Sequence, residues 1–196
     1  ATIVQKMYGG YDDKFPQARA LYMYMYAHPG KKLSFMGNEF GQLREWDEKR
    51  EQDWAVLTYP MHDSFSKFMA RLCRLYLERP ALSRWDDSVD GFRWLDCDSP
   101  LRRCYALVRS CPDESAIAAV FNFSDCVQKW NTLNIGRGNT LTLLLDSTED
   151  RWSGCAPHYP HSLTADENGN VTFDVPRYSA AYYEVGRVSR HAVTAE

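Results

Sequence analysis

The spacing of apolar residues changes near residue 85, and this change constrains the fold more than any other feature of the sequence. The first 80 or so residues follow an order of helix, strand, loop and helix, whereas the rest consists of short strand-like runs separated by turns. Helices and strands bury their apolar faces with different periods. The sequence therefore predicts two parts, an α/β part over residues 1–84 and an all-β part over residues 85–196.

Two segments of the first part have helical spacing. In "FPQARALYMYMYAHPG" Pro16 is expected at the helix start, and the Pro-Gly pair ends the helix. Met23 and Tyr24 add apolar surface on its second side, which predicts neighbours on more than one flank. "HDSFSKFMARLCRLYLERP" carries a second apolar stripe, with Asp63 or Ser64 as the expected N-cap.

Between these helices lies "KKLSFMGNEFGQ", residues 31–42, whose apolar run predicts a strand over residues 32–36 that turns at Gly37. One strand between two helices leaves its edges unpaired and leaves apolar helix flanks uncovered. The chain also has no initiator methionine. We therefore expect the first part to be the tail of a larger repeating α/β structure whose earlier strands are encoded elsewhere.

The second part contains six strand-like segments bounded by the turn-forming stretches "CPDES", "GRGN" and "ENGN". In the third segment Ile117, Ala119, Phe121 and Phe123 alternate onto one face. This pattern predicts an antiparallel β-sandwich of roughly 100 residues. The six segments are "GFRWLDCD", "CYALVRS", "SAIAAVFNFS", "TLTLLLDS", "NVTFDVP" and "SAAYYEV".

Charge and composition exclude several classes of function. The net charge is −3 and no basic stripe occurs, so neither nucleic acid nor an anionic membrane is an expected partner, and neutral substrates fit best. No apolar run reaches the roughly 20 residues that span a bilayer, and no signal-peptide pattern is present. The six cysteines have no CxxC or Cys/His spacing, which predicts free thiols in a cytoplasmic protein without a metal site.

The loop "GNEFGQLREWDEKREQDW" concentrates side chains suited to a ligand, of which we single out Asn38, Glu39, Glu45 and Trp46 as candidate substrate-binding residues. Carboxylates beside indole rings suit sugars, because pyranose rings stack on indole and acids accept hydrogen bonds from hydroxyls. The alternative is structural: Glu39 would pair with Arg44 or a lysine, and the tryptophans would only fill space.

No catalytic residue is predicted. Glycoside cleavage needs two carboxyl groups that flank one bond, but the remaining acids have simpler interpretations. Capping of helix or turn entrances is expected for Asp12-Asp13 and Asp86-Asp87, and a solvated charge run for Asp47, Glu48, Glu51 and Asp53. Phosphate loops, "GxSxG" elbows and recognisable triads are absent from the sequence.

The segment "HPGKKLSFMGNEFGQLREWDEKREQDW" closely resembles the region around the eighth barrel strand of α-1,4-glucan branching enzymes of the α-amylase superfamily. The resemblance continues through "LYLERPAL", "DDSVDGFRWLD", "VFNFS" and "SAAYYEV", as in the C-terminal half of the bacterial type. These enzymes have an N-terminal sandwich, a (β/α)₈ barrel and a C-terminal β-sandwich. The resemblance thus implies that residues 1–84 end the catalytic barrel and that residues 85–196 form the C-terminal sandwich.

The resemblance also implies a division of labour. The family's three catalytic carboxylates lie on earlier barrel strands, so none is carried over to this chain, and the chain alone is expected to be inactive. Asn38 and Glu39 would lie at the barrel mouth. The parent enzyme would cleave α-1,4-linked glucan, such as glycogen or amylose, and transfer it to a 6-hydroxyl in glycogen biosynthesis, without a cofactor. The expected partners are α-glucan and the missing N-terminal part of the same enzyme.

A different class of function is also compatible with the sequence. A non-catalytic carbohydrate-binding β-sandwich could use exposed tryptophans as a stacking platform, and Trp85, Trp94, Trp130 and Trp152 are the candidates. A purely structural domain that packs against the barrel is the third interpretation.

Overall fold

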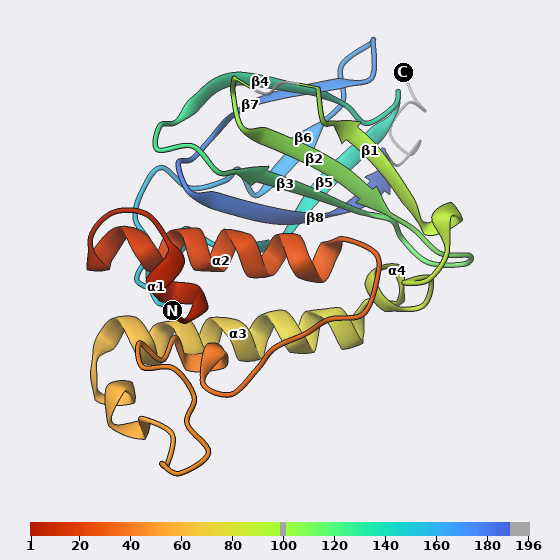
Figure 1. The fold of residues 1–196 in the computed structure, drawn as a ribbon. Coiled ribbons are helices and arrows are strands. Elements are labelled where there is room, and N and C mark those ends of the chain that lie inside the picture. Colours follow the sequence, from red (N-terminus) through yellow and green to blue (C-terminus); the bar gives the residue numbers. More distant parts are fainter. Residues whose placement is uncertain (99–100, 189–196) are drawn as a thin grey trace.

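The computed structural model describes residues 1–98 and 101–188 (Figure 1). Helix α2 lies between helix α3 and one face of a six-stranded sheet, and a two-stranded sheet covers the other face (Figure 1). The helices are α1 (Ile3–Lys6), α2 (Tyr11–Ala27), α3 (Pro60–Glu78) and α4 (Pro80–Ser83), and the 3₁₀ turns are η1 (Asn38–Phe40), η2 (Trp54–Thr58), η3 (Val89–Gly91) and η4 (Asp150–Trp152).

Both sheets are antiparallel. The larger has the order β1-β2-β3-β8-β5-β6, and the smaller consists of β4 and β7. The strands are β1 (Phe92–Asp96), β2 (Cys104–Arg109), β3 (Ile117–Asn122), β4 (Gln128–Asn134), β5 (Asn139–Asp146), β6 (Ser162–Thr164), β7 (Asn170–Val175) and β8 (Ser179–Arg187). All six segments expected to be strands are therefore confirmed, whereas β4 and β6 were missed.

Alternation along β3 connects two apolar cores. Ile117, Ala119 and Phe121 face the helices, as the sequence predicted, and join a core that includes Met23 of α2. Val120 points the other way, into a core between the two sheets. Central strands buried on both faces are expected to be continuously apolar. The first core contains residues from both predicted parts of the chain. The domain boundary at residue 84 stays a prediction.

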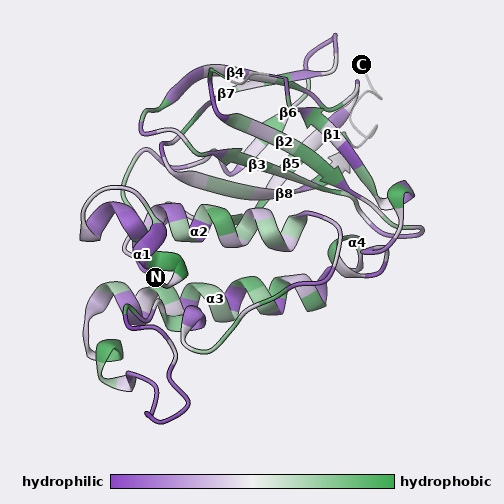
Figure 2. Ribbon diagram, in the orientation of Figure 1, coloured by the Kyte–Doolittle hydropathy of each residue, from purple (hydrophilic) through white to green (hydrophobic). Residues whose placement is uncertain are grey.

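Helix α2 has neighbours on two flanks, as its apolar pattern predicted. Met23 and Ala20 are fully buried, and the helix packs against both the sheet and α3. Within this chain the sheet covers one flank of the helix, so the expectation that the helices would lack partners here is wrong for α2. In Figure 2, α2 and α3 carry both apolar and hydrophilic residues, whereas the loop that follows η1 is mostly hydrophilic.

Both helices begin earlier than the sequence predicted. Helix α2 starts at Tyr11 and contains Pro16 in its second turn. Helix α3 starts at Pro60, so neither Asp63 nor Ser64 is its N-cap. Proline fits the first helical position because the N–H that it lacks would have no intrahelical partner there. Asp63 instead lies in the first turn, where an acid is favoured by the helix dipole.

The predicted strand over residues 32–36 is not a strand in this structure. Leu33, Phe35 and Met36 have exposed fractions of 76%, 51% and 52%. A β-strand needs a neighbouring strand to complete its hydrogen bonds, and none of the described strands pairs with this segment. The apolar pattern of a strand is thus present in residues 32–36, but the hydrogen bonds to a neighbouring strand that would make it a strand are not formed within the described chain.

Candidate functional site

The loop that follows η1 is closed by Gln42, whose side chain is buried. Its Nε2 donates to the carbonyl of Arg44 at 2.7 Å, and its Oε1 accepts from the backbone N–H of Asp53 at 2.8 Å. Gly37 precedes η1 with φ +83°, and a Cβ there would lie 2.8 Å from the Gln42 Cβ. The glycine is therefore needed for the close approach of the Gln42 side chain.

A buried histidine fixes the same loop to α3. The Nδ1 of His62 lies 3.0 Å from the carbonyl oxygen of Phe40, which assigns the proton to that nitrogen. The Phe40 ring in turn contacts Trp54, with centroids 4.9 Å apart. Trp54 is thus engaged in holding η1 and η2 together.

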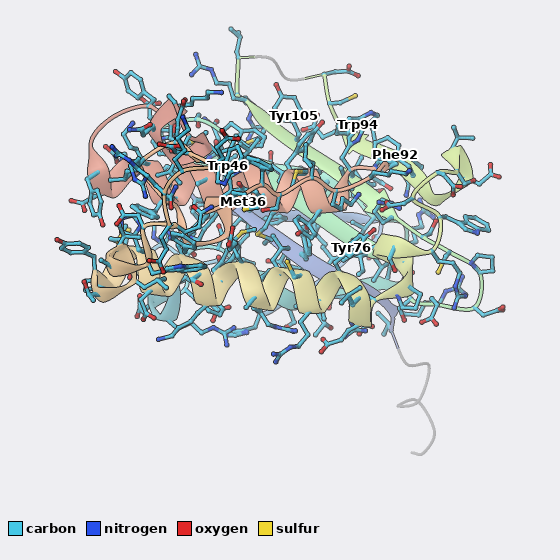
Figure 3. The ribbon with its side chains drawn as sticks, turned by 60° about the horizontal axis from the view of Figure 1, so that its bottom comes forward. Met36, Trp46, Tyr76, Phe92, Trp94 and Tyr105 are labelled. Carbon is cyan, nitrogen blue, oxygen red and sulfur yellow. The ribbon has the colours of Figure 1, made fainter. Side chains whose placement is uncertain are left out.

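Three of the four candidate binding residues meet at one cavity. Asn38, Glu45 and Trp46 line a space of about 280 Å³ together with Phe35 and Met36. Figure 3 shows Met36 and Trp46 close together. The Trp46 indole is 43% exposed and contacts Phe35 edge-on, with ring centroids 5.5 Å apart. The indole thus combines an exposed surface with an apolar neighbour, as in sites that stack sugars.

Glu45 is the acid of this cavity. Its carboxylate is exposed, with 67% of the side-chain surface accessible. A carboxylate that is charged at neutral pH accepts hydrogen bonds from ligand hydroxyls.

Glu39, the fourth candidate, lies on η1 outside the lining of this cavity. It is exposed, and no hydrogen bond or ion pair joins it to another described residue. Arg44, its expected structural partner, instead donates to the carbonyl of Glu51 at 2.7 Å. Burial raises the pKa of Tyr22 to about 12, and the negative charge of Glu39 contributes in the same direction. Glu39 is therefore a free carboxylate beside the cavity.

A second cavity of about 420 Å³ continues along α2. It shares Ile3, Phe35 and Asn38 with the first, and its other lining residues include the exposed Leu33. The polar loop therefore borders an apolar surface that nothing in the described chain covers.

This arrangement suits binding better than bond cleavage. The indole of Trp46 offers a stacking face, and the amide of Asn38 with two carboxylates offers hydrogen-bond partners for hydroxyls. Glu45 is the single carboxylate among the residues that line the 280 Å³ cavity, whereas glycoside cleavage needs two. No cluster of three or more His, Cys, Asp or Glu side chains that could hold a metal occurs in residues 1–98 and 101–188.

The four candidate stacking tryptophans do not form a platform. Trp152 is buried against Phe68, and Trp85 and Trp94 are half-buried against the same core. Trp130 is 79% exposed, on strand β4. Three of the four candidates are therefore part of the core or pack against it.

The simple capping role expected for the two acidic pairs is wrong for Asp12, Asp13 and Asp86. Asp12 and Asp13 lie in the first turn of α2 but do not cap it, because the N-cap is Gly10 and no side chain caps the helix there. Asp86 is not a simple cap, because its Oδ1 lies 3.0 Å from Nη1 of Arg109 and 3.1 Å from Nζ of Lys32. Sequence reasoning missed this cluster because Arg109 follows 23 residues later on another element.

No pattern in the sequence singled out Gln42 or His62 either. Both act on backbone groups several residues away, and local spacing does not show such contacts.

Two structural comparisons define the class of the fold. An Anoxybacillus α-amylase matches with a TM-score of 0.58 at 16% identity, over 90% of this chain and 33% of that one. AmyP, solved in complex with maltotriose, matches with a TM-score of 0.63 at 18% identity, over 90% and 36%. The chain thus has the fold of part of an α-amylase-type enzyme.

Sequence relatives indicate a family. The 1,4-α-glucan branching enzyme GlgB of Butyrivibrio fibrisolvens is 32% identical over 189 residues, which are 93% of this chain and 30% of the enzyme. GlgB of Pseudomonas fluorescens is 37% identical over 153 residues, 78% of this chain and 21% of the enzyme. No family model matches. The chain is similar to part of the 1,4-α-glucan branching enzymes, as the resemblance indicated, and spans less than a third of the length of these relatives.

No described helix has the length and apolar character required to cross a membrane. All six cysteines lie in the described part of the chain and are free thiols.

Proposed function

We propose that the chain is the C-terminal part of a 1,4-α-glucan branching enzyme, in which residues 1–84 complete the catalytic barrel and residues 85–196 form the C-terminal β-sandwich. The observation that carries the proposal is the identity with GlgB enzymes over most of this chain, combined with the small share of those enzymes that it spans. The two antiparallel sheets with an apolar core between them support the sandwich.

The segment over residues 32–36 is the proposed eighth strand of the barrel. Its apolar side chains, Leu33, Phe35 and Met36, are accessible in this chain and border the two cavities beside α2. A barrel strand has two neighbours, and in the parent enzyme both would come from the preceding part of the protein. The segment and the cavity walls would then be covered.

In this arrangement η1 follows the C-terminal end of the eighth strand, which is where barrel enzymes bind their substrates. Asn38, Glu39, Glu45 and Trp46 would contact an α-glucan through hydrogen bonds to its hydroxyls and stacking on a glucose ring. Trp46 and Glu45 face the same cavity, which supports their joint use.

The chemistry would belong to carboxylates outside this chain. A nucleophilic carboxylate would form a glycosyl-enzyme intermediate with a cleaved α-1,4 chain. A 6-hydroxyl of another glucan segment would then displace the carboxylate and create an α-1,6 branch. The residues of this chain would position the glucan, in a cytoplasmic enzyme of glycogen biosynthesis.

The experiment measures α-1,6 linkages formed on amylose, by chain-length analysis after enzymatic debranching. The 196-residue chain alone is expected to form none, because the cavity that it contributes holds a single carboxylate. The full-length parent is expected to form them. Branching by the chain alone, or its absence in the full-length parent, would overturn the proposal.

A further inference from the structure

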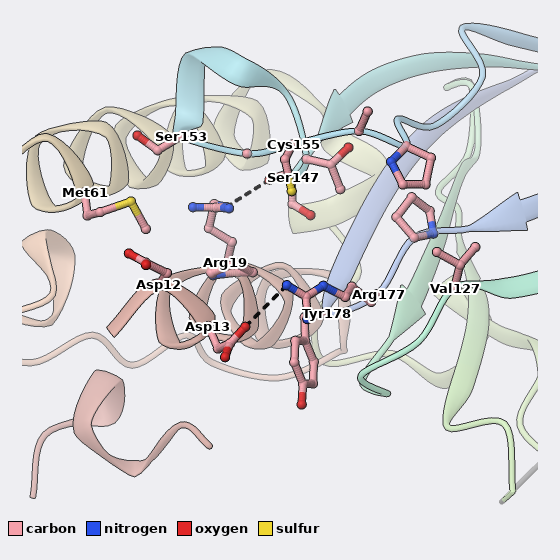
Figure 4. A pocket seen from close by; sticks show the side chains of 16 residues that line it. Asp12, Asp13, Arg19, Met61, Val127, Ser147, Ser153, Cys155, Arg177 and Tyr178 are labelled. Atoms are coloured by element: carbon pink, nitrogen blue, oxygen red, sulfur yellow. Dashed lines mark hydrogen bonds and ion pairs between the residues drawn. The ribbon is translucent and has the colours of Figure 1, made fainter. Parts of the chain in front are cut away.

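A third cavity, of about 460 Å³, lies beside the first turns of α2 (Figure 4). It is enclosed by the start of α2, the segment around η4 and the turn between β7 and β8. Its size falls in the range of about 300–1,000 Å³ that is usual for small-ligand sites. It shares no lining residue with the two cavities beside residues 31–46.

A buried guanidinium forms part of its wall. Arg19 is 1% exposed, and its Nε and Nη1 donate to the carbonyls of Ser147 and Trp152, each at 2.9 Å. Its Nη2 has no hydrogen-bond partner among the described residues. Figure 4 shows the side chain rising from α2 among the lining residues. Arginine has five N–H donors, so Arg19 retains donors for a ligand in the cavity.

The other charges of the cavity balance this guanidinium. Arg177 lies 3.4 Å from Asp13 in an ion pair, and Asp12 adds a second carboxylate to the lining. Two guanidinium groups and two carboxylates leave the lining without net charge. Such a site does not favour an anion, and it offers both donors and acceptors to a neutral ligand rich in hydroxyls.

The lining also differs in composition from the exposed apolar surface that the rest of a barrel would cover. None of the exposed large apolar side chains of the described residues lines this cavity. Those side chains include Leu33, Phe35 and Met36, which border the cavities beside α2. Tyr178 and three prolines instead supply apolar surface next to the polar groups. Sugar sites combine these same two kinds of surface.

We propose that this cavity is a second glucan-binding site, which holds a short α-glucan segment through hydrogen bonds to Arg19, Arg177 and Asp12. The choice of glucan as the hydroxyl-rich ligand rests on the proposed function. The site would retain a glucan chain away from the barrel mouth, so that it acts on affinity for long chains and not on the chemical step.

Cys155 makes the proposal testable in the 196-residue chain. It is exposed and lines the cavity, whereas Cys97 is exposed but outside it. Both thiols are alkylated with iodoacetamide in three conditions: with maltohexaose, with inorganic phosphate, and without addition. Mass spectrometry measures the extent of alkylation of each thiol. Maltohexaose is expected to remove most of the reactivity of Cys155 in a saturable manner, and to leave the reactivity of Cys97 unchanged.

Two arginine variants sharpen the test. Arg177→Ala is expected to weaken the protection by maltohexaose about tenfold, which corresponds to about 1.4 kcal/mol. Arg151→Ala is the matched control, because Arg151 is similarly exposed and also ion-paired, with Glu149, but does not line the cavity. In this control variant, maltohexaose should protect Cys155 as strongly as it does in the chain without a substitution.

Equal alkylation of Cys155 with and without maltohexaose would overturn the proposal, as would protection by phosphate alone or equal effects of the two variants. The result is independent of the branching assay. A parent enzyme that forms α-1,6 linkages while Cys155 stays unprotected would refute the second site and leave the proposed function intact.

Discussion

Asp86→Asn is expected to destabilise the chain strongly, because the carboxylate compensates a completely buried charge. Arg109 has no exposed side-chain surface, and its Nη1 lies 3.0 Å from Asp86 Oδ1. Lys32 contacts the same oxygen at 3.1 Å, and the hydroxyl of Tyr76 donates to the other oxygen. One carboxylate thus forms ion pairs with two cations and links the segment after α2 to β2.

The magnitude follows from what remains after the substitution. Removing one partner of a buried ion pair destabilises a protein by about 3–5 kcal/mol. Arg109 would keep hydrogen bonds to the carbonyls of Ala27, Gly91 and Trp85, at 2.8, 3.1 and 3.3 Å. We therefore expect the lower limit, about 3 kcal/mol, or a fall in Tm of about 6–12 °C for a chain of this size.

Denaturant unfolding followed by circular dichroism measures the effect, with Asp87→Asn as the control. Asp87 is the neighbouring carboxylate, exposed and in no ion pair with a described residue. Its replacement should change the free energy of unfolding by no more than about 0.5 kcal/mol. A change for Asp86→Asn as small as that for Asp87→Asn would refute the role assigned to the cluster.

Two further substitutions test the loop that follows η1. In the full-length parent, Glu39→Gln should lower branching turnover by roughly one to two orders of magnitude through loss of a charge-assisted hydrogen bond of about 1.5–3 kcal/mol, while Glu48→Gln, in the exposed charge run, should leave turnover unchanged; equal turnover of both variants would contradict a substrate-binding role. Gly37→Ala should reduce stability more than Gly138→Ala. Both glycines have positive φ, but only a Cβ at position 37 would collide with Gln42. Equal losses of stability in thermal unfolding would show that the Gln42 side chain moves away without a cost.

The sequence predicted the elements whose own side chains specify them. β3 is a continuous apolar run and β7 alternates apolar with polar residues, so both were identified. β4 was missed because "QKWNTLN" is largely polar and its pairing is interrupted by a bulge between Gln128 and Asn131. Trp130, inside that bulge, has φ +55°, which no strand pattern anticipates.

Contacts between distant residues could not be predicted in the same way. The sequence indicated that Asn38, Glu45 and Trp46 belong to one polar loop, and the structure brings them to one cavity. It gave no sign of the pairing of Asp86 with Arg109, because both residues look like ordinary surface charges in isolation. The apolar run of residues 32–36 was recognised, but a strand also depends on neighbours that this chain does not supply.

The central claim is that residues 32–36 form a barrel strand whose neighbours come from the rest of a branching enzyme. Amide hydrogen exchange of this segment, measured by mass spectrometry in the 196-residue chain and in the full-length parent, tests it most directly. We expect fast exchange of Lys32–Met36 in the monomeric chain and slow exchange in the parent, with β3 and β8 slow in both. Slow exchange of this segment in the monomeric chain, or fast exchange in the full-length parent, would contradict the account.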